Sequence, residues 1–472
     1  MELYDLIDEQ EREGIKNYEI TNIAFDCNEV RSGGLFVALV GKSFDGHDFV
    51  NEAQKNGALV AVVERNVEVD IPQIKVKNTR QSLALISKRF FENAVDKVPV
   101  IAITGTNGKT TTSYMLATIL HEVGCNPCII GTNGVQFNDR NTKIDLTTPD
   151  PPAFHEIVKS AVDGGATHII TEASAHALAL DKLYGINVQS GAFTNFSQDH
   201  LDYFDDMSDY FKAKAKLVCM SKSFVLNYDD EKVMALYDDR KITFGFSEKA
   251  DIYAKNLALN ELGSTFDVVY KDETKHVYCS LVGKFNVYNS LCAIALACCV
   301  GIDFALACSA ISKVKRVDGR VNSYQTEKGV VLIDFAHTPD GLQNLLVNAR
   351  MLCKNKLVLV FGCGGNRDKE KRYIMGRIAS KYCDRIIVTN DNPRDEEPYS
   401  IISEIVRGIK DNKMDEYYIT PDRKSAIIQA YESMDASDIM VIAGKGAEKY
   451  QEIRGVKYPY SDEMIVKTLL KD

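Results

Sequence analysis

The sequence predicts an α/β protein of three domains, and three observations lead to this prediction. The chain has 472 residues, about three times the usual length of one domain. Apolar, strand-like runs alternate with helical periodicity over residues 98–318 and again from 319 onward, as in parallel sheets with crossover helices. Many of these runs lead directly into polar loops. We therefore expect domains at 1–97, 98–318 and 319–472.

The composition is that of an ordinary globular protein, with 45% hydrophobic and 26% charged residues. No apolar stretch approaches the roughly 20 residues of a membrane span. The acidic first residues do not resemble a secretion signal. A net charge of −10 argues against general binding to nucleic acid or to a membrane surface. We expect a cytoplasmic monomer that binds neither and holds anionic substrates with local basic loops.

The twelve cysteines lie mostly in apolar runs such as Leu291–Val300, which is typical of small core residues. The pair Cys125 and Cys128 has no second pair at zinc spacing. A reducing compartment is therefore expected.

The first domain mixes short strands with turns. Strands are expected at Leu35–Leu39 and Ala58–Val63, with a polar, glycine-bounded loop at Gly41–His47 between them.

A phosphate-binding loop is predicted in Val98–Thr112. An apolar run ends at a glycine-threonine loop, and a helix with its stop at Gly124 follows. Strand, loop and helix in this order aim backbone N–H groups at one point. Lys109 can reach the phosphates of a nucleoside triphosphate, and Thr110 can bind Mg²⁺. The pattern is a variant, because Ile103 stands where the first glycine is usual; a plain turn before a helix is the alternative.

Two further acceptors follow in the central domain. His168–Glu172 is predicted to be a strand that ends in a carboxylate, a suitable Mg²⁺ ligand. His200 stands between two acids and is either a metal ligand or an ordinary packed or solvated histidine. From the residues alone, Tyr210–Lys216 is expected to be a solvated helix face.

The third domain shows a regular pattern, because each of four predicted strands runs into a polar loop. The strands are 330–334, 356–361, 385–389 and 439–443, and the loops are 334–340, 362–368, 391–394 and 444–448. Ligands bind beyond the carboxyl ends of parallel strands. The four loops are therefore predicted to converge on one crevice.

Together these motifs resemble the Mur ligase family, over nearly the whole chain from Thr21 to Ser461. The resemblance rests on 105–111, 194–203, 283–289 and the loops 334–340, 362–368 and 391–394. It implies a mixed α/β, UDP-binding N-terminal domain, a central ATP-binding domain and a Rossmann-like C-terminal domain. It also implies an ATP-dependent amide ligase that adds the third residue of the peptidoglycan stem peptide.

The resemblance assigns roles residue by residue. ATP would be bound by Gly105, Thr106, Asn107, Gly108, Lys109, Thr110, Thr111 and Asn289, the last at the adenine. Mg²⁺ would be bound by Thr110, Glu172, His200 and Lys214, where the lysine carries a carbamate. The catalytic set would be Lys109, Glu172, His200 and Lys214.

The substrates are assigned in the same way. UDP-MurNAc-L-Ala-D-Glu would contact Phe25, Cys27, Lys42, Ser43 and Phe44 with its UDP part, and Thr147, Thr148, Ser174 and Lys182 with its muramoyl-dipeptide. The incoming amino acid would contact Arg367, Asp391, Asn392, Pro393, Arg394, Gly444 and Glu448.

The amino acid is predicted to be meso-diaminopimelate. It differs from lysine by one distal carboxylate, and an arginine fork suits that group. Arg394 matches the family position for this contact. The alternatives are L-lysine or another amino acid, a folylpolyglutamate synthetase-like ligase, which would share the phosphate loop, and a non-enzymatic nucleotide switch.

Five residues depart from the usual family pattern and leave room for altered substrate choice. They are Cys27 and Ala175 in place of serines, Phe335 in place of tyrosine, Asn366 in place of aspartate and Ala447 in place of histidine.

Overall fold

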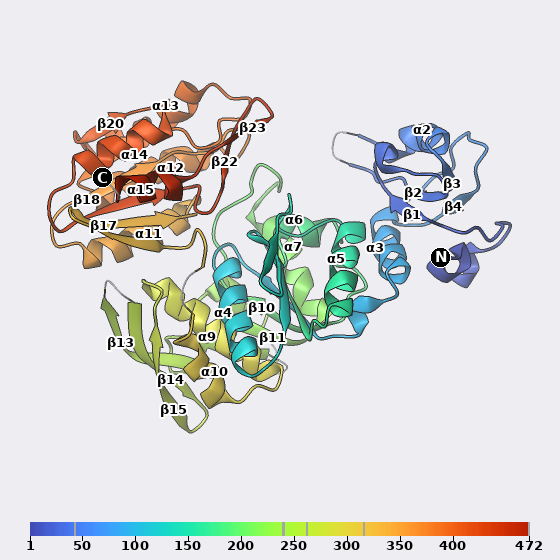
Figure 1. Cartoon of the computed structure of the whole chain (residues 1–472), viewed down its shortest axis with the longest axis horizontal. Helices are drawn as coiled ribbons and strands as arrows, with labels where there is room; N and C mark the ends of the chain where they lie inside the picture. The colour runs from blue at the N-terminus through green and yellow to red at the C-terminus, as the bar shows by residue number, and fades with distance from the viewer. Residues whose placement is uncertain (42–43, 238–240, 261–262, 315–316, 471–472) are drawn as a thin grey trace. The chain divides into compact units, whose positions relative to one another are not determined.

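The computed structural model describes residues 1–41, 44–237, 241–260, 263–314 and 317–470. The chain forms two compact units, which are described separately (Figure 1). The first comprises residues 1–104, 124–191 and 213–223, and the second comprises residues 105–123, 192–212 and 224–472.

The first unit begins with a four-stranded parallel sheet. Its order is β1 (Asn22–Ala24), β2 (Gly34–Val37), β3 (Ala58–Val63) and β4 (Gln73–Lys75). Helices α1 (Leu3–Leu6), α2 (Val50–Lys55) and α3 (Thr79–Phe90) accompany it. Leu35 and Val37 pack into one core and Phe36 into another, so both faces of the sheet are covered. The two strands predicted in this region are confirmed.

The rest of the first unit has the strand order β5 (Val100–Thr104), β9 (His168–Glu172), β6 (Pro127–Gly131), β7 (Gly134–Phe137) and β8 (Arg140–Thr142). The first three strands are parallel, and the last two are antiparallel. Helix α5 (Pro151–Asp163) connects β8 to β9, and α6 (Ala175–Ala179) follows β9. Along the chain, β10 (Val188–Phe193), α7 (Met207–Met220) and β11 (Ser221–Asn227) each have residues in both units.

The second unit contains α4 (Lys109–Glu122), α8 (Glu231–Met234), α9 (Lys284–Cys299) and α10 (Phe304–Ile311). Helix α4 ends at Glu122, close to the predicted stop, and Gly124 has a φ of +81°. Strands β12 (Lys241–Gly245), β13 (Ile252–Asn260), β14 (Gly263–Tyr270) and β15 (Glu273–Cys279) end in an antiparallel meander. Cys292 on α9 is fully buried, as expected of a small core residue.

The C-terminal part of the second unit is a six-stranded sheet. Its order is β16 (Asn322–Thr326), β17 (Gly329–Asp334), β21 (Asp438–Ala443), β18 (Leu357–Phe361), β19 (Arg385–Val388) and β20 (Tyr417–Ile419), and only β16 is antiparallel. The four predicted strands are confirmed.

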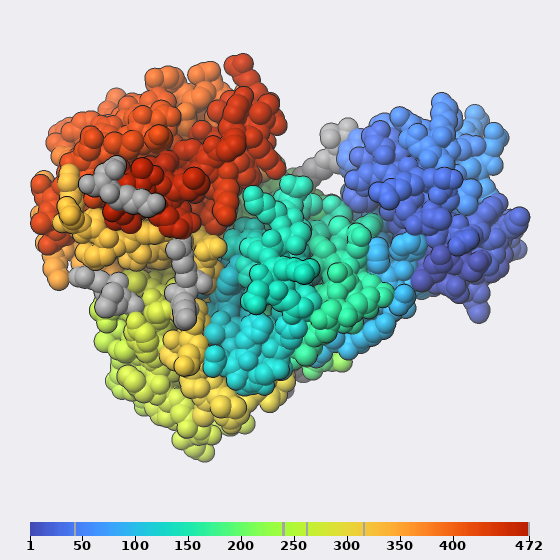
Figure 2. All heavy atoms as spheres, in the orientation of Figure 1, coloured from blue at the N-terminus to red at the C-terminus, as the bar shows by residue number. Residues whose placement is uncertain are grey.

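Helices cover both faces of this sheet, as the two separate cores show. Helices α11 (Pro339–Leu352), α12 (Glu370–Tyr382) and α13 (Pro398–Asp411) contribute to one core, and α14 (Arg423–Glu432) and α15 (Asp462–Leu469) contribute to the other. A hairpin of β22 (Tyr450–Ile453) and β23 (Val456–Pro459) precedes α15. Figure 2 shows the atoms of this part, orange to red, closely packed.

One local prediction is wrong. The face of α7 at Tyr210–Lys216 is not uniformly solvated, because Tyr210 and Lys214 are 0% and 1% exposed. Residues four apart share a helix face, and this face is continued by the buried Leu217. Lys212, on another face, has a side chain that is 70% exposed.

None of the helices in the described residues combines the length and the apolar character that crossing a bilayer requires.

We expect the buried ion pair Arg423–Asp462 to be a strong determinant of stability. Both side chains are 0% exposed, and the closest N···O distance is 2.8 Å. Asp462→Asn leaves the guanidinium without its charged partner, so it should lower the free energy of unfolding by about 3–5 kcal/mol. Urea unfolding followed by circular dichroism measures this loss.

The neighbouring ion pair Lys467–Glu463 is the control, because its side chains are 55% and 27% exposed. Glu463→Gln should cost less than about 1 kcal/mol. Equal losses for the two variants would contradict the prediction.

Candidate active site

The phosphate loop takes its shape from two glycines. Gly105 and Gly108 have φ values of +141° and +88°. A Cβ atom at Gly105 would overlap Thr194 Oγ1, and one at Gly108 would overlap Asn289 Oδ1. Side chains are therefore excluded at both positions by conformation and by space.

The loop is also fixed by backbone contacts with Asn195. The Thr106 N–H donates to the Asn195 carbonyl over 2.9 Å, and the Asn107 N–H donates to Asn195 Oδ1 over 2.9 Å. Helix α4 starts at Lys109, so the loop lies at a helix N-terminus, where anions are stabilised.

The side chains of the loop point to phosphate chemistry. Lys109 Nζ donates to the carbonyls of Gly105 and Thr106 over 2.7 and 2.9 Å, which holds its charge over the loop. Thr110 and Thr111 are buried in the first turn of α4. The structure thus brings the seven predicted loop residues together with Asn289.

Two contacts of the loop with the C-terminal part were missed by the sequence reasoning. Arg320 Nη2 donates to Thr110 Oγ1 over 2.9 Å, and Asn107 Nδ2 donates to Asp340 Oδ2 over 3.0 Å. The guanidinium of Arg320 lies 4.8 Å from the ring centroid of Phe335. The pair Gly319-Arg320 in the sequence could have indicated the Arg320 contact, since it puts a cation directly after a glycine at the expected domain boundary.

His200 lies beside an acid rather than alone. Its backbone φ is +56°, and its Nε2 is 3.3 Å from Asp199 Oδ2. Burial raises the pKa of Asp199, but the charges of His200, His337 and Lys371 outweigh burial and lower the pKa to about 2. Asp199 is therefore an anion at neutral pH.

In the first unit, Glu172 ends β9 as predicted and is 1% exposed. Its Oε1 accepts the N–H of Thr132 and its Oε2 accepts the hydroxyl of Thr132, each over 3.0 Å. Gly131 leaves room for this carboxylate, because a Cβ atom there would overlap Oε1.

The four residues predicted to bind the muramoyl-dipeptide are linked to Glu172 either directly or through Thr132 and Thr148. The Thr148 hydroxyl donates to the Glu172 carbonyl over 2.7 Å and is 3.3 Å from Ser174 Oγ. Thr147 Oγ1 is 3.2 Å from Thr132 Oγ1. Lys182 Nζ reaches the Thr148 carbonyl over 3.4 Å and pairs with Asp150 over 2.8 Å.

The residues predicted to bind UDP lie in the N-terminal sheet region. Phe25 is partly buried against the core, Cys27 is 7% exposed and Phe44 is 53% exposed. Burial and the nearby charges of Glu52 and Asp26 raise the pKa of the Cys27 thiol, so it stays a weak neutral donor. Lys42 and Ser43 lie outside the described residues.

The third-domain loops converge as predicted. Asn392 Nδ2 donates to Glu448 Oε2 over 2.9 Å, and the buried Lys445 donates to both side chains over 2.8 Å. A Cβ atom at Gly444 would lie 2.6 Å from Asp391 Oδ2. The Gly444 N–H donates to the Asp334 carbonyl over 3.1 Å, which brings in the 334–340 loop.

Electrostatics keep Asp391 charged in this cluster. Burial raises the pKa of its carboxyl, but the cations of Lys445 and Arg423 lower it below the ordinary value overall. Lys445, which the sequence reasoning also missed, thus neutralises a buried acidic cluster.

Arg394 is held in an unusual backbone conformation with a φ of +50°. Its N–H donates to the Glu452 carbonyl over 3.1 Å, and its carbonyl accepts the Arg454 N–H over 2.9 Å. Its Nη1 donates to the Gly365 carbonyl over 2.8 Å, and its Nε contacts Glu452 over 3.1 Å.

Arg367 and Pro393 belong to the same junction. Arg367 Nη1 donates to the Asn366 carbonyl over 3.0 Å. Gly365 allows the Pro393 carbonyl to approach, because a Cβ atom would overlap it. The loops of the two predicted arginines therefore touch.

The predicted metal ligands divide between the units. Thr110 and His200 belong to the second, and Glu172 and Lys214 belong to the first. Thr110 and Glu172 supply oxygen donors, which Mg²⁺ prefers, and Lys214 is 1% exposed.

A phosphate loop on an α/β framework, joined to polar loops at the end of a second parallel sheet, defines a nucleotide-binding α/β protein of three domains. Three family models match the chain: the Mur ligase family catalytic domain over residues 19–91, the Mur ligase middle domain over 103–297 and the Mur ligase glutamate ligase domain over 319–446.

Curated relatives extend the match to the whole chain. The UDP-N-acetylmuramoyl-L-alanyl-D-glutamate–2,6-diaminopimelate ligase of Aquifex aeolicus is 41% identical over 456 residues, covering 96% of this chain and 94% of that protein. Its namesake from Clostridium acetobutylicum is 38% identical over 468 residues, covering 97% and 96%. The chain therefore belongs to the Mur ligase family.

Solved structures agree with this assignment. A structure of a ligase of the same name superposes with a TM-score of 0.69 at 30% identity, covering 96% of this chain and 95% of that one. The folylpolyglutamate synthase of Mycobacterium tuberculosis, at 16% identity and a TM-score of 0.64, covers 78% of this chain and 92% of its own, and shares the fold. The predicted fold class and family are confirmed.

We predict that Gly105→Ala weakens ATP binding. The new methyl group would overlap Thr194 Oγ1, and the loop must move or accept a strained backbone at a cost of about 1–3 kcal/mol. The dissociation constant of an ATP analogue, measured by calorimetry, should rise about tenfold.

Gly124→Ala is the matched control, since Gly124 also has a positive φ of +81° but nothing within 4 Å of a Cβ atom. It should lower stability without changing the dissociation constant. Equal effects of both variants on ATP binding would show that space in the loop is irrelevant.

Proposed function

We propose that this protein is the ATP-dependent ligase that joins meso-diaminopimelate to the D-glutamate carboxyl of UDP-MurNAc-L-Ala-D-Glu. It would act as a cytoplasmic monomer in peptidoglycan precursor synthesis. The observation that carries the proposal is the junction of the Arg367 and Arg394 loops. That junction lies in the same unit as a phosphate loop bonded to Arg320 and Asp340.

In this proposal, each of the three predicted domains binds a different substrate or part of a substrate. Residues 1–97 hold the UDP end, residues 98–318 hold ATP and the dipeptide carboxyl, and residues 319–472 hold the incoming amino acid. The cluster of Thr147, Thr148, Ser174 and Lys182 supports the second assignment, since hydroxyls and a buried cation suit a carboxylate-bearing peptide.

The first step activates a carboxylate, which is a poor acyl donor. One carboxylate oxygen of the D-glutamate attacks the γ-phosphorus of ATP, the bond to the β-phosphate oxygen breaks, and ADP leaves. The loop N–H groups at the start of α4 and Lys109, which is held over the loop, would stabilise charge on the transferred phosphoryl group.

Mg²⁺, which prefers oxygen ligands, would lower the charge of the phosphates. The proposed ligands are Thr110 and His200 of the second unit, and Glu172 and a carbamate on Lys214 of the first. A carbamate would turn the buried cation of Lys214 into a carboxylate-like oxygen donor.

The second step forms the amide. The amine of diaminopimelate attacks the acyl carbon, the bond to the phosphate oxygen breaks, and phosphate leaves as the amine loses a proton. Asp391, whose carboxyl is kept charged by nearby cations, and Glu448 belong to the third-domain loops and would bind the ammonium group of the amino acid.

The proposed choice of diaminopimelate rests on arginine chemistry. The side-chain bonds of Arg394 use Nε and Nη1, two of the five N–H donors of a guanidinium. A distal carboxylate can bind the remaining face of the fork bidentately, whereas lysine has no such group. Lysine addition and glutamate addition to a folate remain the competing hypotheses.

The decisive experiment is phosphate release by the purified full chain with ATP, Mg²⁺ and UDP-MurNAc-L-Ala-D-Glu. Release should depend on meso-diaminopimelate and be at least about tenfold slower with equal L-lysine, because one charged hydrogen-bonded contact is missing. Faster release with lysine would reverse the assignment. Release with L-glutamate and a folate would favour the synthetase alternative.

Arg394→Ala should raise the KM for diaminopimelate about tenfold or more, since the distal carboxylate loses a charge-assisted contact. The KM for ATP should stay within about twofold, because the variant leaves the phosphate loop intact. Steady-state kinetics checks both values. Arg407→Ala on the exposed face of α13 makes the same change in charge and should leave both unchanged.

A further inference from the structure

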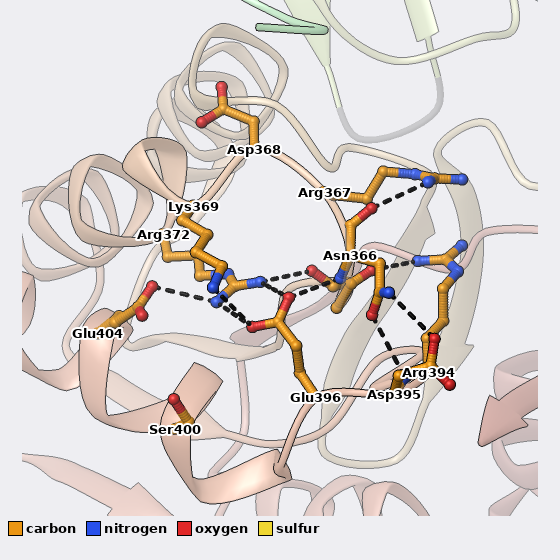
Figure 3. A network of polar contacts seen from close by, with 12 residues as sticks. Asn366, Arg367, Asp368, Lys369, Arg372, Arg394, Asp395, Glu396, Ser400 and Glu404 are labelled. Atoms are coloured by element: carbon orange, nitrogen blue, oxygen red, sulfur yellow. Dashed lines mark hydrogen bonds and ion pairs between the residues drawn. The ribbon is translucent and has the colours of Figure 1, made fainter. Parts of the chain in front are cut away.

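The loops that carry Arg367 and Arg394 are tied together by a reciprocal pair of side-chain contacts. Asn366 Nδ2 donates to Asp395 Oδ2 over 3.1 Å, and the Asp395 N–H donates to Asn366 Oδ1 over 3.3 Å (Figure 3). Each partner is the chain neighbour of one of the two arginines. A shift of this pair therefore moves both guanidinium groups.

The pair requires an amide at one position and a carboxylate at the other. Asn366 both donates and accepts, which an ionised carboxylate cannot do. Its φ of +53° lies in the left-handed region, where asparagine and aspartate are the best tolerated side chains. Aspartate, the usual family residue at this position, would fit the backbone but would place two carboxylates face to face.

An ion pair between a fully buried guanidinium and a partly exposed carboxylate fixes the base of the junction. The Asn366 N–H donates to Glu396 Oε1 over 2.6 Å. Arg372, which is 0% exposed, binds both oxygens of Glu396 over 2.9 Å and also reaches Glu404 over 3.1 Å. Hydrogen bonds from Arg372 hold the pKa of Glu396 at about 2, although burial opposes this. The backbone of Asn366 is therefore held by a charged, hydrogen-bonded pair.

The same guanidinium reaches the loop backbone, because Arg372 Nη2 donates to the Gly364 carbonyl over 3.2 Å. Arg394 Nη1 binds the next carbonyl, that of Gly365, over 2.8 Å. The loop between Gly364 and Asn366 is thus held by the buried Arg372 on one side and by Arg394 and Asp395 on the other.

We propose that Asn366 and Asp395 are a matched pair of positioning residues that sets the spacing of Arg367 and Arg394 for the incoming amino acid. The inference rests on the proposed function. Neither residue needs to touch the amino acid; their effect is transmitted through the backbone of the two loops.

The test exchanges the two groups. Asn366→Asp alone opposes two carboxylates, and Asp395→Asn alone removes the charge that accepts the amide N–H. The double variant Asn366→Asp/Asp395→Asn restores one amide and one carboxylate with the direction of the side-chain bond reversed. The N–H of residue 395 still finds an oxygen acceptor at residue 366.

Steady-state phosphate release is measured for the full chain with meso-diaminopimelate, L-lysine and ATP varied in turn. Asn366→Asp should raise the KM for diaminopimelate about tenfold, with a smaller change in kcat and an unchanged KM for ATP. The double variant should return the KM to within about threefold of wild type, since contacting residues are non-additive. Asn355→Asp is the matched control. It makes the same substitution at an exposed position just before the first residue of β18, and it should change none of the KM values.

The outcomes separate the two claims. A double variant as impaired as the sum of the single variants, or a parallel rise in the KM for ATP, overturns the positioning role while leaving the function intact. A general loss of stability, seen as lowered Tm with all KM values unchanged, also overturns it. A wild-type protein that prefers L-lysine overturns the proposed amino acid, but the rescue pattern then tests the pair with that substrate.

Discussion

The C-terminal site depends most on one buried guanidinium, that of Arg423. It binds Asp462 through two nitrogens and also donates to the carbonyls of Ala443 and Asn390 over 2.9 and 3.4 Å. Those carbonyls belong to the residues just before Gly444 and Asp391. A single guanidinium therefore links the backbone at the ends of β21 and β19. This guanidinium must be paired with an anion, because burying an unpaired charge is costly. The loops that would bind the amino acid begin directly after the two carbonyls that Arg423 holds.

A second constraint links nucleotide and amino acid within one unit. Thr110, at the start of α4, accepts a hydrogen bond from Arg320, and Asn107 binds Asp340. Both partners come from the segment that also carries the Gly444 and Asp391 loops. In the proposed function Thr110 also binds Mg²⁺, so a bound nucleotide would compete for a contact that the C-terminal part already makes.

The sequence predicted strands and loop positions well because both follow local rules. The apolar runs at 58–63 and 168–172 coincide with strands, and the polar loops after β17, β18, β19 and β21 meet because parallel strands end at one edge. The same local rules gave a wrong prediction for Lys214. A lysine on a helix is usually solvated, and only tertiary packing buries this one. Arg320 and the Asn366–Asp395 pair were missed because their partners lie far away in the sequence, and Lys445 was missed because it binds Asn392, 53 residues away, as well as the nearby Glu448. Only family resemblance supplied the role of Lys214.

The departures from the usual family pattern fall unevenly over the molecule, and their contacts explain why the phosphate loop is preserved. Phe335 lacks a hydroxyl but keeps the aromatic ring on which Arg320 rests, so the cation beside Thr110 keeps its support. Ala447 lies where Gly319 approaches its backbone closely, and a small side chain is compatible with that contact. Asn366 instead changes hydrogen bonding, because it gains a donor that a carboxylate lacks, and Asp395 uses that donor. The first two changes therefore keep contacts at Gly319 and Arg320, whereas the third creates a contact at the proposed amino-acid arginines. Divergence in substrate handling is expected at that junction.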